Sequence, residues 1–487
     1  MLSLSPENTT FFQTIAGKIN DLIGEINGYL YTYILVALLI GTGLYFFIRS
    51  RALPLRLFIE SIRVVAERPE RSGELSSFHA LMVSTASRVG VGNITGVASA
   101  IALGGPGAVF WMWVIATLGG ASAFVESTLA QIYKKRGKTA DDHSIGGPAY
   151  YIESALKKRW LAITFAVALI TTYMGGFNLL ASFNVAEAFT AYDWYTPELT
   201  PYIIGGVLAV AMAVSIFGGS KRLTTVTSLL VPVMATIYII VALFVIIVNW
   251  RNVPHMFSTI FSNAFDFPAI FGGFTGSAMM LGIKRGLYSN EAGVGSAPNA
   301  AASASVSHPV KQGLVQMLSV FIDTMIICTL TAFLILSSGI QGGEDLKGGP
   351  LVIQSMETAL HQFALPFTTI ALVLFAFTTI IGNFYYAEVN LRFLTRAHGT
   401  PQWLLQAFRA FAVVLVFAGA LLDFSLAWNI GDLLMGCMAL INLPVILLLG
   451  SKALACAKDY EEQKRAGVNP QFVASRIGIT EKLDYWQ

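Results

Sequence analysis

The chain has 487 residues, of which 55% are hydrophobic and only 12% are charged. Soluble domains carry roughly 25% charged residues, so this composition excludes an ordinary soluble protein and indicates one that crosses a membrane several times. The formal net charge of +3 says little by itself. We expect the lipid bilayer, and no nucleic acid, as the partner of this surface.

Eleven apolar segments are long enough to cross a bilayer, because a spanning helix needs about 20 apolar residues. They cover residues 28–48, 76–103, 106–133, 160–186, 201–217, 223–250, 267–287, 312–338, 363–391, 404–422 and 426–450. Residues 1–27 precede the first segment, residues 49–75 form an amphipathic link to the second, and residues 451–487 are a polar tail. The pattern predicts an all-α integral membrane protein with 11 transmembrane helices.

The basic residues indicate how these segments are oriented. If the N-terminus lies outside, every lysine and arginine falls on the inner side except Arg88 and three others. Those three are Lys18, Arg251 and Lys347. The inner set includes Lys284 and Arg285, at the inner end of the seventh segment. The positive-inside rule then predicts an outer N-terminus and a cytoplasmic C-terminus in the cell (inner) membrane.

The second apolar segment is interrupted near its centre by residues 88–93, which include an arginine, two glycines and an asparagine. Glycine is a poor helix former, and an arginine at the bilayer centre costs about 2.5–3.5 kcal/mol on insertion scales. Backbone that leaves its helix at this depth survives only inside protein or beside a water-filled cavity. We interpret the stretch as a broken helix that lines a binding site. The alternative is a glycine-rich packing face, since Gly92 and Gly96 have the spacing of close helix contacts.

A second glycine-rich interruption opens the seventh segment, at residues 272–277. Four segments after each interruption stands a proline within a span, Pro232 in the sixth and Pro444 in the eleventh. Residues 76–250 and 267–450 therefore form two five-span blocks behind one extra helix, and an odd number of spans makes the blocks inverted. Paired interruptions of this kind are typical of a transporter's substrate site. The alternative is that the glycines coincide by chance.

Several runs of residues resemble the alanine or glycine:cation symporter family, also called sodium:alanine symporters. The most specific are Phe-Trp-Met-Trp at 110–113 and Ser-Asn-Glu-Ala-Gly at 289–293. The others cover residues 87–100, 104–109, 146–151, 294–300, 323–324 and 375–379. The resemblance implies a leucine-transporter-like fold of two inverted five-helix repeats preceded by one extra helix. It also implies sodium-coupled uptake of a small neutral amino acid, and we expect a monomer without enzymatic activity.

Two positions depart from the family pattern. Asn383 stands where members with a small alanine pocket typically have tryptophan, and Ser182-Phe183-Asn184 stands where the family often has Gln-x-Asn. A smaller polar residue at 383 should enlarge the pocket and add hydrogen-bonding capacity. Both departures leave room for a bulkier or more polar substrate, such as glutamine.

The chemistry of an amino acid suggests where it would bind. Free amide N–H groups at the start of a half-helix suit its carboxylate, and carbonyl groups freed at the second interruption suit its ammonium group. The predicted substrate-binding residues are Arg88, Val91, Gly92, Asn93, Asn184, Phe274, Thr275, Gly276, Ser277 and Asn383.

The resemblance also carries over a sodium site, and Na+ is the ion that we expect the protein to bind. A hard cation takes oxygen ligands. The predicted ligands are the carbonyl groups of Ala86, Val89 and Phe375 and the hydroxyl groups of Thr378 and Thr379.

Arg88 and Asp323 would each be costly alone near the bilayer centre. Asp323 lies near the middle of the eighth segment, which flanks the position of a first sodium ion in the implied fold. We predict that the two residues form an ion pair that replaces this sodium, because a buried charge needs a partner. The alternative is that Arg88 faces a wet vestibule unpaired and Asp323 is an independent ligand. Glu126 and Glu291 are expected toward inner helix ends, as gate or structural residues.

Other classes of function were weighed against a symporter. A channel usually shows a repeated filter loop or symmetric subunits, whereas here two non-identical broken helices are expected to face one another. An intramembrane enzyme is disfavoured because no zinc-protease, paired-aspartate or nucleophile-elbow motif stands on a span. Within the transporters, proton coupling is the alternative to sodium coupling.

Overall fold

The computed structural model describes residues 6–70, 74–137, 144–217, 219–265, 277–396 and 399–486. Within these ranges the chain is helical, and its extended pairings are two isolated bridges, Leu75 with Ala304 and Lys135 with Ile145. The α-helices are α1 (Pro6–Tyr29), α2 (Val36–Arg49), α3 (Leu53–Arg56), α4 (Phe58–Val65), α5 (Ser77–Arg88), α6 (Val97–Gly104), α7 (Ala108–Ile132), α8 (Pro148–Leu156), α9 (Arg159–Ile170), α10 (Asn178–Ala188), α11 (Thr200–Ile216), α12 (Gly219–Val248), α13 (Val253–Ala264), α15 (Ala278–Asn290), α16 (Pro298–Ala301), α17 (Pro309–Val320), α18 (Thr329–Ser338), α19 (Gly348–Leu360), α20 (Ala364–Thr395), α21 (Gln402–Gly419) and α22 (Phe424–Arg465). The π-helical segments η1 (Leu30–Leu35), η2 (Gly92–Gly96), η3 (Thr171–Phe177) and η6 (Phe321–Cys328) join consecutive helices, and η4 (Trp250–Asn252), η7 (His361–Phe363) and η8 (Ala474–Ile477) are short 3-10 turns.

Eight of the described helical stretches are long and apolar enough to cross a membrane, and two shorter apolar helices cover Gly92–Gly104 and Thr200–Ile216. A helix lies at each of the apolar segments predicted from the sequence, although the seventh is described only from residue 277 onward. The all-helical architecture is thus confirmed, while the number of crossings stays a prediction.

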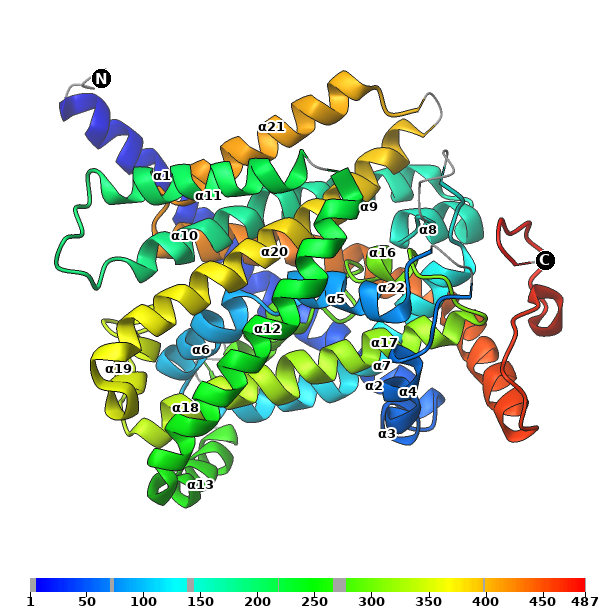
Figure 1. Ribbon diagram of the computed structural model, residues 1–487, viewed down its shortest axis with the longest axis horizontal. Helices are drawn as coiled ribbons and strands as arrows, with labels where there is room; N and C mark the ends of the chain where they lie inside the picture. Colours follow the sequence, from blue (N-terminus) through cyan, green and yellow to red (C-terminus); the bar gives the residue numbers. More distant parts are fainter. Residues whose placement is uncertain are drawn as a thin grey trace.

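Figure 1 shows how the elements are arranged: α1 projects at one end of the molecule, and the end of α22 with the C-terminal tail lies at the other. The centre is formed by α7, which packs against α17, α15, α2 and α22, while α20 packs against α10, α12 and α5. Of the two broken elements, α5 packs against α20 and α15 packs against α7. The chain around both breaks is buried: every residue of 81–100 and of 282–320 is shielded from solvent.

The predicted interruption of the second segment is confirmed. Helix α5 begins after Ser76, whose side chain accepts a hydrogen bond from a backbone N–H in the first turn. It ends at Arg88, because Val89 has a non-helical ψ of 87°, and the chain becomes helical again by Gly92. We call Val89 and Gly90 the first break.

The short helices α8 and α19 support the predicted internal repeat. Each begins at a Gly-Gly-Pro sequence, residues 146–148 and 348–350. Gly147 and Gly348 have φ of +134° and +59°, which glycine adopts easily. Helix α8 follows the third predicted span and α19 follows the eighth, so the two occupy corresponding places in the two blocks. Pro232 and Pro444 likewise lie inside α12 and α22.

The seventh segment differs from its prediction. Residues 272–276 of the expected interruption lie outside the described residues, but the chain leaves the helix at a second place. Helix α15 ends at Asn290, Glu291 has a left-handed φ of 52°, and residues 291–297 are non-helical and buried. We call residues 291–297 the second break.

Lys284 and Arg285, which the orientation argument counted on the inner side, are buried within α15. Both side chains form ion pairs with Asp432 of α22. Lys284 Nζ lies 2.7 Å from its carboxylate, and the Arg285 guanidinium lies 3.1 Å from it. The Arg285 guanidinium also lies 4.0 Å above the ring of Trp428. The two cations therefore share one carboxylate inside the protein, and their position carries no information about membrane orientation.

Candidate functional site

The two breaks lie against each other. Ser87, just before the first break, has its hydroxyl 3.2 Å from the carboxylate of Glu291 in the second break and 2.7 Å from the amide oxygen of Asn383 in α20. Gly92 faces the ring of Tyr288, and a Cβ at this position would lie 2.7 Å from that ring. Only glycine allows this approach without displacing the ring, which explains why the interruption is rich in glycine.

The side chain of Asn93 closes the first break. Its Oδ1 accepts a hydrogen bond of 2.8 Å from the N–H of Gly90, which in a continuous helix would be bonded to the carbonyl of Ala86. Its Nδ2 donates to Ser289 Oγ at 2.9 Å and to Asp323 Oδ1 at 2.7 Å. The carbonyl of Ala86 therefore loses its helical donor, and the amide of Asn93 ties the break to α15 and η6.

The predicted ion pair between Arg88 and Asp323 is wrong. Both oxygens of Asp323 are taken by neutral donors, from Asn93 at 2.7 Å, from Ser289 at 2.7 Å and from the hydroxyl of Thr324 at 2.8 Å. Arg88 Nη1 instead donates to the backbone and side-chain oxygens of Gln316, at 3.3 and 3.2 Å. A buried carboxylate saturated by three hydrogen bonds does not require a cation in direct contact.

The other edge of the Arg88 guanidinium has no partner among the described residues. Its Nε and Nη2 atoms are buried without a hydrogen bond, and the residue is only 2% exposed. Its charge acts at longer range on three buried carboxyl groups, those of Glu126, Glu291 and Asp323. Because an unpaired buried donor costs about 1–3 kcal/mol, and more when charged, this edge is suited to an anionic group.

A second unpartnered atom lies on the opposite side of the first break. The hydroxyl of Thr379 in α20 is buried and makes no hydrogen bond, and a Cβ on Gly90 would lie 2.1 Å from it. Thr378, by contrast, donates to the carbonyls of Leu374 and Phe375 of its own helix at 3.1 and 3.0 Å. A buried hydroxyl without a hydrogen-bond partner suits a small hard cation such as Na+, which takes oxygen ligands.

Not all of the predicted substrate residues reach the breaks. Asn184 donates to the carbonyl of Leu180 within α10, and no described contact joins it to either break. Ser277 caps the start of α15 by accepting from the N–H of Met280, about 18 Å along the helix from Ser289. It is therefore far along the helix from the contact between the two breaks, and its role as a site residue stays a prediction. The predicted residues Phe274, Thr275 and Gly276 lie outside the described residues.

Asn383 does reach the site. Besides its contact with Ser87, it donates through Nδ2 to Asn178 Oδ1 of α10 at 3.0 Å. The Nδ2 atom of Asn178 is buried and makes no hydrogen bond. Amide groups from two helices therefore continue the polar wall beyond the first break.

Sequence reasoning missed the carboxylates of the second break. Glu291 stands at the end of α15, as expected, and is part of the second break, whereas Glu126 lies within α7; both are buried. Glu126 accepts from the N–H of Gly293 at 3.2 Å and from Asn442 Nδ2 at 2.8 Å. A signal was present in the sequence, since Gly293 and Gly295 follow three polar residues, and both glycines have positive φ.

The geometry can now be compared with known proteins. A family described as the sodium:alanine symporter family matches residues 16–474. The chain belongs to the sodium:alanine symporter family. Together with its apolar helices, this membership makes it a multi-pass membrane transporter, in a family of transporters and not of enzymes.

Relatives of this family member align over nearly their whole length. It is 45% identical over 472 residues to the amino-acid carrier protein AlsT of Bacillus subtilis, with 96% of this chain and 98% of the relative covered. It is 41% identical to the probable sodium/glutamine symporter GlnT of Bacillus subtilis, with 96% of both chains covered. It is 37% identical to the sodium/alanine symporter AgcS of Methanococcus maripaludis, with 91% and 98% covered.

Proposed function

We propose that the protein couples the inward movement of Na+ to the uptake of a small neutral amino acid, of the alanine and glycine class or glutamine. Transport proceeds by alternating access around the two breaks. The observation that carries this proposal is the contact between the two buried breaks, beside an unpartnered guanidinium edge of Arg88 and an unpartnered hydroxyl of Thr379. Family membership supports the same function.

The substrate carboxylate binds at the free edge of Arg88 and at the start of the second half-helix, where Val91, Gly92 and Asn93 stand. A helix N-terminus and a guanidinium both stabilise an anion. The ammonium group faces the second break, where the carboxylate of Glu291 is held by the hydroxyl of Ser296 at 2.6 Å. This assignment moves the ammonium site from residues 274–276 to the second break.

Sodium binds on the α20 side of the first break. Its ligands are the carbonyls of Ala86, Val89 and Phe375 with the hydroxyls of Thr378 and Thr379, of which Thr379 is the unpartnered one. Three buried carboxyl groups and one guanidinium at the breaks favour a further cation, because the site then approaches neutrality. Sodium supplies one positive charge, whereas a zwitterion adds no net charge.

The amide groups of Asn383 and Asn178 set the substrate size and polarity. A pocket wall of two amides suits a substrate whose side chain carries an amide. The relative named as a probable sodium/glutamine symporter supports glutamine as one candidate, and the relative named as a sodium/alanine symporter supports alanine as another.

For the arrangement of the helices in the membrane, we propose the one that the two five-span blocks of the sequence predict. Two inverted repeats, residues 76–250 and 267–450, pack behind an extra helix at 28–48 in a leucine-transporter-like fold. The N-terminus (1–27) lies outside, and residues 49–75 and 451–487 lie in the cytoplasm. The paired Gly-Gly-Pro starts of α8 and α19 support this repeat.

Uptake by the purified protein in liposomes tests the proposal. An inward Na+ gradient should drive saturable accumulation of labelled alanine or glutamine, and replacement of Na+ by choline should abolish it. A panel of unlabelled amino acids as competitors identifies the substrate. Uptake that follows an imposed proton gradient in choline would support proton coupling instead, and non-saturable flux would support a channel.

A further inference from the structure

The last residues of the chain fold back onto the body of the protein. We call residues 466–486, which follow α22, the C-terminal strap. It is polar in composition, but it buries the apolar side chains of Phe472, Ile479 and Leu483. The strap therefore has a defined packed position and is not a solvated tail.

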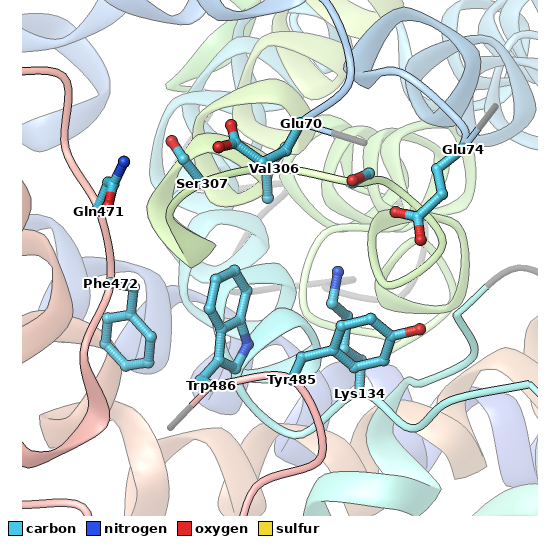
Figure 2. A pocket seen from close by; sticks show the side chains of 10 residues that line it. Glu70, Glu74, Lys134, Val306, Ser307, Gln471, Phe472, Tyr485 and Trp486 are labelled. Carbon is cyan, nitrogen blue, oxygen red and sulfur yellow. The ribbon is translucent and has the colours of Figure 1, made fainter. Parts of the chain in front are cut away.

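Trp486 of the strap contacts α5 and the segment that follows α16. Its ring packs against a small buried cluster formed by Ala80 of α5 and by Ala304 and Val306, which follow α16. Its indole N–H donates to the carbonyl of Gln131 of α7 at 2.8 Å. Figure 2 shows Trp486 pointing toward Val306 in a cavity of about 190 Å3 that Ser307 and Phe472 also line. One side chain thus contacts the first half of one broken element and the segment beyond the other break.

A hydrogen bond joins the segment just before α5 to the segment that follows α16. The N–H of Ser305 donates to the carbonyl of Leu75 at 2.9 Å, just before α5. Gln131 Nε2 of α7 donates to the carbonyls of Ala301 and Ala304 at 2.5 and 2.9 Å. Separation of the start of α5 from residues 301–307 would break the bond between Ser305 and Leu75.

Polar contacts hold the strap over this junction. The N–H of Phe472 donates to the carbonyl of Ser307 at 3.0 Å, and the hydroxyl of Ser307 donates to the carbonyl of Pro470 at 2.8 Å. Asp484 pairs with Lys135 at the end of α7, at 2.9 Å. The strap is therefore bonded both to residues 301–307 and to the end of α7.

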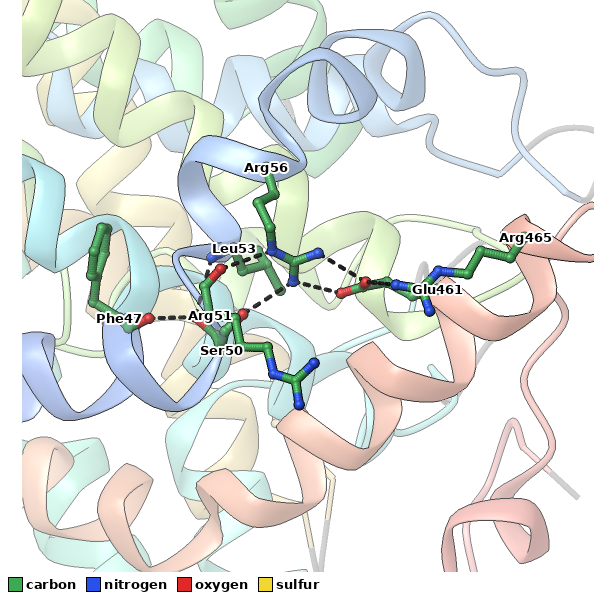
Figure 3. Close-up of polar contacts among 7 residues, drawn as sticks. All are labelled: Phe47, Ser50, Arg51, Leu53, Arg56, Glu461 and Arg465. Carbon is green, nitrogen blue, oxygen red and sulfur yellow. Dashed lines mark hydrogen bonds and ion pairs between the residues drawn. The ribbon is translucent and has the colours of Figure 1, made fainter.

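The base of the strap is anchored separately. Figure 3 shows Arg56 of α3 holding both carboxylate oxygens of Glu461, near the end of α22, and each contact is 2.9 Å long. Lys464 and Tyr460 contact Glu60 of α4 at 2.8 and 2.7 Å. Movement of the strap can therefore leave α22 in place, because its base does not depend on Trp486.

We propose that the C-terminal strap is a latch on the gate at the side of the molecule that the strap covers. Trp486 holds the start of α5 against residues 301–307, and it must leave before the site opens to that side. The inference rests on the proposed function only in that alternating access needs such a gate. The contacts that define the latch do not depend on which substrate is carried.

Hydrogen–deuterium exchange of the full chain in lipid nanodiscs tests the latch without a substrate. Trp486→Ala should make the amides of residues 75–81 and 301–308 exchange at least tenfold faster, while those of α19 stay unchanged. Trp486→Phe keeps the ring packing and loses the indole donor, so its effect should be smaller. Trp403→Ala is the matched control, because Trp403 is 71% exposed at the start of α21.

Two outcomes would overturn the latch. One is unchanged exchange at both segments in Trp486→Ala. The other is an equal acceleration in α12 and α20, which would mean general destabilisation. Uptake gives an independent readout: loss of the latch favours the state open to this face and should raise the half-saturating external Na+ at least threefold. If the wild type takes up no amino acid, the proposed function fails, but the exchange result still decides the latch.

Discussion

The two breaks differ in the charge of the side chains beside them. The first break follows a guanidinium, and its backbone is satisfied by the side chain of Asn93. The second break carries carboxylates and is shaped by glycines at positive φ, with Glu126 and Asn442 holding Gly293 from other helices. The first is completed mainly by residues within a few positions in sequence, the second by α7 and α22. Together the two breaks offer a guanidinium and carboxylates, which match the carboxylate and the ammonium group of a zwitterion.

The largest expected effect comes from removing the cationic half. Arg88→Ala leaves three buried carboxyl groups without the guanidinium that offsets them, and breaking such an arrangement typically costs about 3–5 kcal/mol. Substrate affinity measured by calorimetry should fall by more than about a hundredfold. Arg88→Lys should not restore it, since an ammonium lacks the flat edge of a guanidinium.

Arg159→Ala serves as the control for Arg88, because Arg159 is half exposed and pairs with Glu153 at the protein surface. Affinity within threefold of wild type in Arg88→Ala would show that the guanidinium does not bind the substrate carboxylate.

The next largest effect is expected from Gly90→Ala, which tests whether the first break needs a residue without a side chain. In Gly90→Ala the new methyl group would meet the hydroxyl of Thr379 at 2.1 Å, so α5 and α20 must move apart. Overpacking of this kind costs about 1–3 kcal/mol, and the half-saturating Na+ concentration in uptake should rise about tenfold or more. Gly175→Ala in η3 is the matched control, because nothing lies within 4 Å of its Cβ. Equal kinetics in the two variants would contradict the close approach.

A smaller effect separates the two neighbouring threonines. Thr379→Ala removes the unpartnered hydroxyl and should raise the half-saturating Na+ concentration about fivefold to tenfold, since one ligand contributes about 1 kcal/mol. Thr378→Ala should do less, because that hydroxyl already bonds to its own helix. Thr379→Ser keeps the oxygen and should behave as wild type. If Thr378→Ala were the more damaging variant, the sodium site would lie on the other side of α20.

The smallest effect lies away from both breaks, where α4 meets α22. Burial raises the pKa of Glu60, but hydrogen bonds from Lys464 and Tyr460 outweigh it and bring the pKa below its ordinary value of 4.5. The ionised group therefore stabilises the fold above about pH 4.5, and this contribution is lost as the pH falls through the lowered pKa. Thermal unfolding between pH 7 and pH 4 should show a loss smaller than about 1 kcal/mol. Glu60→Gln should abolish that part of the pH dependence, and an unchanged pH profile would contradict it.

The sequence by itself determined where the helices lie and where the first break falls. Long apolar segments have few alternatives in lipid, where each backbone group must be bonded within its own helix or by nearby protein. An arginine with two glycines at mid-segment is a local pattern, so Arg88, Gly90 and Asn93 could be singled out without knowing their neighbours. The prolines of α12 and α22 could be placed for the same reason.

Only the tertiary structure decided which charges meet. Hydropathy and spacing are properties of one segment, whereas a partner is supplied by a helix far away in sequence. Asp323 is satisfied by Asn93 and Ser289 and not by Arg88. Lys284, which was counted among the charges of the inner side, pairs with Asp432 from a helix more than a hundred residues later. The second break depends on Glu126 of α7 in the same way, because a buried carboxylate is stable only where folding brings donors to it.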